Sequence, residues 1–324
     1  MKAIVCTDYG SPDVLQLKEV EKPAPKDNEV LVRIHATTVT AAHTMMRKGV
    51  PYFGRLFTGL TRPKHAIPGT ELAGVVEAVG KDVTHFKVGD QVFGATDLEG
   101  GCNAEYTCVP EDGVLAAKPA NLGYGEVATM IDGALTSMHF LRDKGHIQRG
   151  QRVLINGASG SVGSAAVQLA KFFEAEVTGV CSTKNIELVK SLGADEVIDY
   201  TREDFTQSGQ TYDIIFDAVG KSSFPQCKRS LKPQGVYLTT VAGLPAMAHT
   251  LWTSIVGGKK AVFGAAGLRP TKEKVDDLVL LKELIETRTM EPVIDRCYPL
   301  EQVADAHRYV DTGHKRGNIA ITVA

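Results

Sequence analysis

The sequence predicts an α/β protein of two unlike domains, the second of which is a doubly wound parallel sheet. Over residues 1–120 apolar and polar residues alternate with a period of two, which is typical of β-strands. From residue 124 onward helical periodicity alternates with short apolar runs, the βαβ pattern of a parallel sheet. A glycine-rich turn at 157–163 joins one of these runs to a helix.

The first domain is expected to be irregular and mostly β. Turns that carry Gly, Pro and Asp separate its strand signals. These signals are Ala3–Cys6, Leu15–Leu17, Glu29–Ile34 and Leu72–Val79.

The second domain is expected to alternate helices with buried strands. Helices are expected at 126–142, 161–174, 185–192 and 222–231, and strands at 152–156, 176–181, 196–198, 213–217 and 235–240. A helix at 272–288 and a last strand at 318–323 close the chain. Two unlike domains favour a ligand site in a cleft between them.

The central motif runs from Val153 to Gly163. Three apolar residues give a strand signal, glycines follow at positions 157, 160 and 163, and residues 165–173 give a helix signal. Glycine lets the backbone approach phosphates, and the first N–H groups of the helix face the anion, so the pattern predicts a pyrophosphate site. The spacing departs from G-x-G-x-x-G because Ala158 stands where the first glycine is expected, and an ordinary tight turn is the alternative.

The residues after the next apolar run, Glu176–Cys181, indicate which dinucleotide binds. An Asp or Glu there would bind the ribose hydroxyls and repel a 2′-phosphate. The chain instead has Ser182, Thr183 and Lys184, which supply two hydroxyl donors and a cation. NADPH is therefore favoured over NADH, although Lys184 as a solvated residue at a helix start is the alternative.

Composition narrows the function classes. The 324 residues suffice for two domains, and 43% hydrophobic and 23% charged residues are ordinary for a globular protein. A formal net charge of −2 gives no reason to expect nucleic acid or an anionic membrane as partner. The six cysteines include no C-x-x-C pair, which argues against a disulfide framework and a four-cysteine zinc lobe. Without a signal peptide or a membrane-spanning apolar run, we expect a cytoplasmic protein.

Motifs along the whole chain carry a family resemblance. They are Gly10–Leu15, Pro68–Gly80, Phe86–Gly94, Ala104–Tyr106, Gly133–Thr136, the glycine stretch and Pro292–Arg296. Together they resemble the zinc-independent quinone oxidoreductase branch of the medium-chain dehydrogenase/reductase superfamily. The resemblance implies a GroES-like domain of residues 1–123 and 267–324 and a Rossmann NADPH-binding domain of residues 124–266.

The resemblance also implies a homodimer. In it, edge strands near Ala261–Phe263 pair across the two subunits, which removes an aggregation-prone edge. The apolar segment Leu244–Gly258 either covers the cleft or packs at the dimer interface.

The chain departs from the family at the metal site. Zinc alcohol dehydrogenases of this superfamily hold a catalytic metal with Cys, His and Cys, and the matching positions here are Thr40, Thr70 and Asp132. Hydroxyl groups are poor zinc ligands, and one carboxylate does not replace two thiolates. Cys102 and Cys108 also lack the companions of a structural zinc site. No metal is therefore expected, which leaves hydride transfer to an electron-poor quinone or α,β-unsaturated carbonyl.

Four residues are candidates for catalysis. Thr40 stands where family members usually have Asn near the nicotinamide. His43 and Asp132 are hypothesised to relay the proton that accompanies hydride transfer, and the alternative is that both are hydrogen-bonded structural residues. His139 lies seven residues after Asp132 and shares its helix face, and the alternative is that it only faces a neighbouring helix. Tyr52 lies near the place of a catalytic Tyr in related enoyl-thioester reductases, and a core or lid aromatic is its alternative.

The other cofactor residues follow from matching family positions. Thr136 matches a contact to the nicotinamide carboxamide, and Tyr200 matches a Tyr beside the adenine and 2′-phosphate, where it can stack and donate. Small residues at strand ends let the backbone approach the ribose. The expected set is Thr136, Ser159, Gly160, Ser161, Val162, Ser182, Thr183, Lys184, Tyr200, Ala218, Val219, Val241, Ala242, Phe263, Gly264 and Asn318.

The leading interpretation is a zinc-independent, NADPH-dependent reductase of quinones or α,β-unsaturated carbonyls. A 2-enoyl-thioester or enone reductase is the alternative among enzymes. The alternative that is not an enzyme is an NADPH-binding sensor, structural protein or adaptor, since Thr40 and His43 depart from the family. The retained pyrophosphate and phosphate-reading residues argue against that last alternative.

Overall fold

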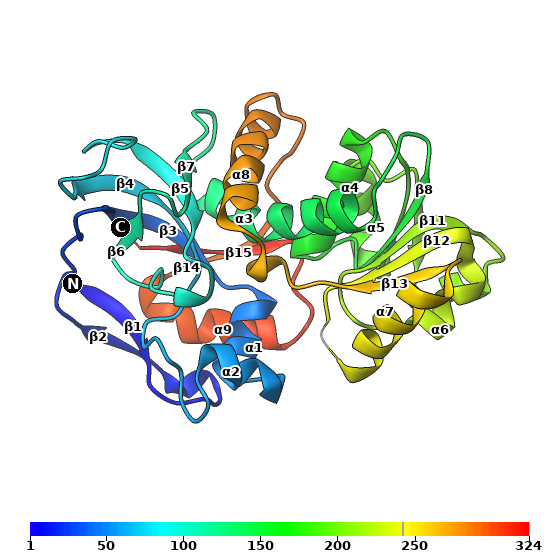
Figure 1. Ribbon diagram of the computed structural model, residues 1–324, viewed down its shortest axis with the longest axis horizontal. Coiled ribbons are helices and arrows are strands. Elements are labelled where there is room, and N and C mark those ends of the chain that lie inside the picture. The colour runs from blue at the N-terminus through cyan, green and yellow to red at the C-terminus, as the bar shows by residue number, and fades with distance from the viewer. Residues whose placement is uncertain (242, 324) are drawn as a thin grey trace. The chain divides into compact units, whose positions relative to one another are not determined.

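The computed structural model describes residues 1–241 and 243–323, apart from the side chain of Asp97. Its internal contacts divide the chain into two compact units (Figure 1): unit 1 is Met1–Asp132 with the chain from Arg269 onward, and unit 2 is Gly133–Leu268. The first division falls inside the helix α3 (Tyr124–Met138), nine residues after the boundary expected from the sequence. A π-helical turn, His139–Lys144, continues α3.

Unit 1 is the β-rich unit. Its larger sheet has the order β14-β15-β3-β4-β5-β7, with β6 also paired to β3, and β1 pairs with β2 separately. The strands are β1 (Lys2–Cys6), β2 (Leu15–Glu19), β3 (Glu29–Thr38), β4 (Glu71–Val79), β5 (Gln91–Ala95), β6 (Tyr106–Pro110), β7 (Val114–Ala117), β14 (Ile294–Pro299) and β15 (Asn318–Thr322). The helices are α1 (Ala41–Lys48), α2 (Arg55–Thr58), α8 (Thr271–Glu286) and α9 (Val303–Asp311).

Unit 2 is built on six parallel strands in the order β10-β9-β8-β11-β12-β13. Since β8 comes first in the chain, this is the strand order 3-2-1-4-5-6 of a Rossmann fold, and the predicted doubly wound sheet is confirmed. The strands are β8 (Arg152–Asn156), β9 (Glu176–Cys181), β10 (Glu196–Asp199), β11 (Tyr212–Asp217), β12 (Leu231–Thr239) and β13 (Lys260–Phe263). The helices are α4 (Ser161–Phe172), α5 (Ile186–Ser191), α6 (Phe224–Cys227) and α7 (Leu244–Val256).

The glycine turn after β8 requires its glycines. Gly157 has φ +84°, a left-handed conformation that favours glycine. A Cβ on Gly163 would lie 2.1 Å from the carbonyl oxygen of Gly157, so the first turn of α4 packs directly on the backbone after β8. The turn therefore brings the amino end of α4 to the carboxyl end of β8, as the sequence motif predicts.

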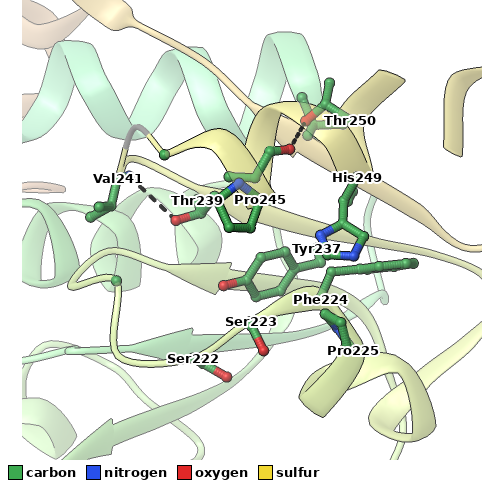
Figure 2. A pocket seen from close by; sticks show the side chains of 15 residues that line it. Ser222, Ser223, Phe224, Pro225, Tyr237, Thr239, Val241, Pro245, His249 and Thr250 are labelled. Carbon is green, nitrogen blue, oxygen red and sulfur yellow. Dashed lines mark hydrogen bonds between the residues drawn. The ribbon is translucent and has the colours of Figure 1, made fainter. Parts of the chain in front are cut away.

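Helices α6 and α7 lie beside the last two strands of the sheet. Thr250 and Thr253 of α7 accept hydrogen bonds from backbone N–H groups of β13, Thr250 from Phe263 at 3.0 Å and Thr253 from Ala261 at 3.0 Å. A pocket of about 350 Å³ remains between these elements (Figure 2).

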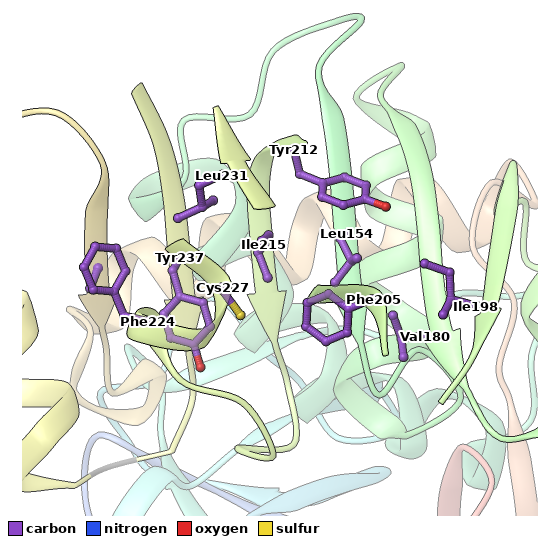
Figure 3. Close-up of a cluster of buried hydrophobic side chains, with 11 residues drawn as sticks. Leu154, Val180, Ile198, Phe205, Tyr212, Ile215, Phe224, Cys227, Leu231 and Tyr237 are labelled. Atoms are coloured by element: carbon purple, nitrogen blue, oxygen red, sulfur yellow. The ribbon is translucent and has the colours of Figure 1, made fainter. Parts of the chain in front are cut away.

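One face of the sheet in unit 2 is covered by a single hydrophobic cluster (Figure 3). Each of the six strands contributes at least one side chain, so the cluster crosses the whole width of the sheet. Its members are Leu154, Val180, Ile198, Phe205, Tyr212, Ile215, Phe224, Cys227, Leu231, Tyr237 and Ala261. In the described part of the chain, no helix has both the length and the apolar character needed to cross a bilayer.

Replacing Gly163 by Ala tests the close approach at the glycine turn. The new Cβ would overlap the Gly157 carbonyl oxygen, so we expect Gly163→Ala to lower the free energy of unfolding by roughly 2–3 kcal/mol. Gly267→Ala is the matched control in unit 2, because a Cβ there has no heavy atom within 4 Å. Thermal melts of equal midpoint for the two variants would contradict the prediction.

Candidate functional site

The carboxyl edge of the sheet in unit 2 gathers most of the expected cofactor residues. Every one of them except Asn318 lies in unit 2, and Ala242 lies outside the described residues. Val219 and Val241, which follow β11 and β12, are 42% and 38% exposed, so their turns are open to a ligand. In α/β sheets of this order a dinucleotide binds at this edge, where the strand order reverses.

The amino end of α4 fits a pyrophosphate group. Gly160 is the N-cap residue, and because glycine has no side chain, the cap residue leaves room for an anion beside the first turn of α4. Ser159 accepts a hydrogen bond from Asn185 Nδ2 at 2.9 Å, which fixes the turn, and the carbonyl oxygen of Val162 accepts from Ser137 Oγ at 3.0 Å. Gly133 lets α3 pack closely, because a Cβ there would lie 2.8 Å from the carbonyl oxygen of Ser161.

A buried carboxylate, which the sequence analysis missed, holds the turn after β11. Asp217 is fully buried, and its Oδ1 accepts hydrogen bonds from Asn156 Nδ2 at 3.0 Å and from the N–H of Gly220 at 3.0 Å. Its Oδ2 accepts from the N–H of Ser222 at 2.9 Å and from the Tyr237 hydroxyl at 3.0 Å. These bonds fix the backbone that carries Ala218 and Val219.

One of the residues expected to bind the 2′-phosphate, Thr183, is hydrogen-bonded to a second carboxylate, that of Asp199. Thr183 donates its hydroxyl proton to Asp199 Oδ2 at 2.5 Å, and this bond is the main cause that lowers the pKa of Asp199. Because its proton is engaged, the Thr183 hydroxyl is not a free donor for a phosphate. Lys184 and Tyr200 are exposed and Ser182 is half-buried, so these three side chains remain accessible to a ligand.

The remaining cofactor positions differ in their surroundings. Thr136 is half-buried on α3. Phe263 ends β13, and a Cβ on Gly264 would lie 3.2 Å from His139 Nε2, so the chain after β13 passes close to that ring. Asn318 begins β15 in unit 1, and its Nδ2 donates to the carbonyl oxygen of Val293 at 3.1 Å.

The candidate catalytic residues of unit 1 lie in a network of hydroxyl, imidazole and carboxylate groups. Thr40 caps α1, and its Oγ1 accepts from the N–H of His43 at 3.3 Å. His43 Nε2 lies 2.7 Å from Thr70 Oγ1, and Thr70 donates to Glu71 Oε1 at 2.6 Å. Thr38 donates to Glu71 Oε2 at 2.5 Å. Thr70 is half-buried, whereas His43 and Glu71 are buried.

These bonds fix the proton on His43. Its Nδ1 accepts from the N–H of Thr40 at 3.3 Å, which completes a reciprocal capping box in which His43 takes the place of the usual Glu or Gln. Because Nδ1 is an acceptor, the neutral ring carries its proton on Nε2 and donates it to Thr70. Protonating Nδ1 would break the cap of α1. The network therefore favours a positioning role for His43.

Asp132 and Lys315 have perturbed titrations in the same unit. Burial raises the pKa of the half-buried Asp132 carboxyl to about 6, and the Glu71 carboxylate adds to the rise. Burial lowers the pKa of Lys315 to about 8, opposed by the negative charges of Asp132 and Asp295. A carboxyl group with a pKa near 6 can hold a proton and release it close to neutral pH.

Tyr52 lies apart from that network. It begins the short helix η2 (Tyr52–Gly54), is 74% exposed, and has the guanidinium carbon of Arg55 4.9 Å from its ring centre. The same guanidinium carbon lies 4.5 Å from the ring centre of Tyr9. This arrangement favours a surface aromatic over a buried proton donor.

A catalytic zinc ion like that of the zinc alcohol dehydrogenases does not fit the residues present. The hydroxyl groups of Thr40 and Thr70 are hydrogen-bonded to protein groups, and Asp132 supplies one carboxylate. Across residues 1–241 and 243–323, no group of three or more His, Cys, Asp or Glu side chains is placed to hold a metal. Burial raises the pKa of Cys102 to about 12 and that of Cys108 to about 11, so neither is a ready thiolate ligand.

Two of the missed acidic residues carried a weak sequence signal. Glu71 stands at the start of an apolar strand segment, and Asp217 ends the buried run of β11. A charged residue inside an apolar run is buried only with partners, so each was a marker of a hydrogen-bond network. The partners themselves, such as Thr38 and Tyr237, are distant in sequence and could not be identified from it.

Two family models of dehydrogenase domains match parts of the chain. A family model described as alcohol dehydrogenase GroES-like domain matches residues 26–120, and one described as zinc-binding dehydrogenase matches residues 192–321. The first match confirms the predicted GroES-like character of the β-rich unit.

Relatives of known activity match over nearly the whole chain. The 2-methylene-furan-3-one reductase of Solanum lycopersicum is 34% identical, over 99% of this chain and 79% of the relative. The NADPH-dependent alkenal/one oxidoreductase of Arabidopsis thaliana is 32% identical, over 99% of this chain and 79% of the relative. The solved structure of the quinone oxidoreductase from Coxiella burnetii has a TM-score of 0.88 at 27% identity, and the match covers 100% of this chain and 99% of that one.

The raised pKa of Asp132 predicts a pH-dependent stability. Its pKa of about 6 in the folded protein exceeds the ordinary value of 3.8, so the folded state binds this proton more tightly than the unfolded chain. The resulting stabilisation is complete below about pH 4 and is lost as the pH rises through about 6. Asp132→Asn should therefore raise the free energy of unfolding at pH 7.5 by on the order of 2 kcal/mol and change it little at pH 4.

Denaturant titrations at the two pH values measure this difference. Asp112, an exposed residue in the turn between β6 and β7, provides the control, and Asp112→Asn should show no pH-dependent gain. A gain for Asp132→Asn that is equal at pH 4 and pH 7.5 would contradict the assigned titration.

Proposed function

The chain belongs to the quinone-oxidoreductase-like branch of the medium-chain dehydrogenase/reductase superfamily, and on that premise we propose that it transfers hydride from NADPH to quinones or α,β-unsaturated carbonyls. The observation that carries the proposal is the glycine turn that brings the amino end of α4, with Gly160 as its N-cap, to the edge where a Rossmann sheet binds its dinucleotide. The names of the relatives support NADPH and conjugated acceptors.

Residues of unit 2 bind and orient the cofactor in this proposal. The first N–H groups of α4 hold the pyrophosphate, and Asp217 fixes the turn against which the ribose lies. The exposed Lys184, with Ser182 and Tyr200, receives the 2′-phosphate. When bound, NADPH supplies the hydride.

We further propose that Asp132 supplies the proton. Reduction of a quinone or enone leaves an oxyanion that must be protonated, and a carboxyl group with a pKa of about 6 is partly protonated near neutral pH. His43 then orients the Thr70 hydroxyl through its Nε2 proton and does not donate a proton itself.

The reaction is proposed to proceed without zinc. Two hydroxyl groups and one carboxylate replace the metal ligands of the zinc enzymes, and both hydroxyls are hydrogen-bonded within the protein. A conjugated acceptor spreads the incoming negative charge over its own atoms, so it needs less help from a Lewis acid than a simple aldehyde does.

A steady-state panel tests the function. We expect reduction of a benzoquinone, a naphthoquinone or an enone, selective for NADPH over NADH and unchanged by a chelator, with no reduction of a simple aldehyde. NADPH binding without turnover of any acceptor would favour a sensor or adaptor. Loss of activity with a chelator would refute the zinc-free mechanism, and selectivity for NADH would refute the role given to Lys184.

We also propose that the protein is a homodimer formed through unit 2. Strand β13 is the last strand of its sheet, so one of its edges is unpaired within the described residues. The neighbouring helix α7 exposes large apolar side chains, among them Leu251, Trp252 and Ile255 at 68%, 65% and 78%. An open strand edge beside an apolar helix face is typical of a self-association surface.

A charge on α7 should dissociate the dimer. We expect the wild type to sediment as a dimer at micromolar concentration and Leu251→Glu as a monomer, because the carboxylate would be desolvated in the interface. Val279→Glu places the same charge on an exposed apolar position of α8 in unit 1 and should leave the dimer intact. A monomeric wild type, or an unchanged Leu251→Glu, would contradict the proposal.

A further inference from the structure

Unit 2 contains a pocket of about 350 Å³, which Val241 of the expected cofactor residues lines (Figure 2). It lies between β12, β13, α6 and α7, and its lining comes from unit 2 alone. Its volume is at the lower end of the range of small-molecule sites, which suits a ligand part of one or two rings.

The walls of the pocket are formed largely by rings. Phe224 lies 5.7 Å from His249 and 6.4 Å from Tyr237 between ring centres, with tilts of 52° in both pairs. Pro225 and Pro245 add two further flat apolar surfaces to the lining. Rings at such distances provide faces and edges against which a flat ligand ring can pack.

His249 is a polar side chain of the pocket that is available to a ligand. The Tyr237 hydroxyl donates to Asp217, and the Thr250 hydroxyl donates to the carbonyl oxygen of Ala246 and accepts from Phe263. Within the described part of the chain, no hydrogen bond joins the ring nitrogens of His249 to a protein group. A neutral imidazole offers one donor and one acceptor, so it can bind a carbonyl or hydroxyl oxygen carried by the ligand ring.

The pocket adjoins the proposed cofactor edge. Gly220 and Val241 both line it. Gly220 lies in the turn after β11, beside Val219, and Val241 lies in the turn after β12. The two turns touch, because a Cβ on Gly220 would lie 2.4 Å from Val241 Cγ2. A ligand in the pocket therefore lies next to the turns expected to approach the ribose.

We propose that this pocket binds the ring of an oxygen-bearing aromatic or quinone acceptor, packed on Phe224 and His249 with a ring oxygen hydrogen-bonded to His249. The inference rests on the proposed function and narrows its substrate class to acceptors that carry a ring. An open-chain alkenal has no ring that fills the pocket, so packing against these walls does not strengthen its binding.

Two alanines on α7 provide a matched pair of variants. Ala246 lines the pocket, and Ala248 is exposed and does not line it. We expect Ala246→Phe to lower kcat/KM for 1,4-naphthoquinone about tenfold or more, because the new ring occupies the ligand's place, and to leave propenal within about twofold. Ala248→Phe should leave both acceptors within about twofold, and sedimentation should give the same oligomeric state for both variants.

His249 is tested separately. His249→Ala should lower kcat/KM for 1,4-naphthoquinone roughly fivefold, whereas His249→Gln, which keeps a donor and an acceptor, should retain most of it. Equal losses on 1,4-naphthoquinone and propenal in any of these variants, or no loss in Ala246→Phe, would overturn the ring site.

Direct binding separates failure of the site from failure of the proposed function. Calorimetry with 2-naphthol, a ring with one hydroxyl that accepts no hydride, should show binding to the wild type with NADPH present. This binding should persist in Ala248→Phe and be lost in Ala246→Phe. If 2-naphthol binds in this way but no acceptor is turned over, the proposed function is refuted and the ring site is supported. Quinone turnover with identical 2-naphthol binding in both variants would support the function and overturn the site.

Discussion

The backbone at the carboxyl edge of the sheet in unit 2 depends on the hydrogen bonds that the buried Asp217 carboxylate accepts. It ties the end of β8 to the turn after β11 through Asn156 and Gly220, and it ties that turn to the hydrophobic cluster through the Tyr237 hydroxyl. A fully buried charge is tolerated only when its oxygens are satisfied, so the turn cannot relax without leaving that charge unpaired. The sheet core, the cofactor turn and the ring-lined pocket therefore share one set of hydrogen bonds.

Unit 1 uses hydrogen bonds where the zinc enzymes of the superfamily use metal ligation. His43, Thr70 and Glu71 form a chain with a fixed direction of donation, and Thr40 closes it by capping α1. Donation ends on the Glu71 carboxylate, which leaves the half-buried Thr70 as the accessible member of the chain. Asp132, whose pKa burial raises to about 6, adds to the same unit a carboxyl group that can hold a proton near neutral pH.

The periodic features of the sequence predicted the fold well, and its isolated polar residues predicted the site less well. The alternation of apolar runs and helices gave the parallel sheet, and the glycine spacing gave the turn before α4, because both depend on local geometry. Helix α1 was missed because its cap pairs Thr40 with His43 and lacks the usual Glu or Gln. The engagement of Thr183 by Asp199 was missed because their contact spans 16 residues and two strands, which no local pattern records.

The burial of the cysteines has a chemical consequence for a protein that handles conjugated carbonyls. Such acceptors alkylate thiolates at their β-carbon, and the reaction requires a deprotonated, accessible sulfur. Burial raises the pKa of Cys102 to about 12 and those of Cys181 and Cys227 to about 11, so these thiols stay protonated and enclosed. Cys297 is exposed and lies on β14, in the unit that does not carry the cofactor edge. The fold thus keeps the nucleotide-binding unit resistant to modification by its own electrophilic substrates.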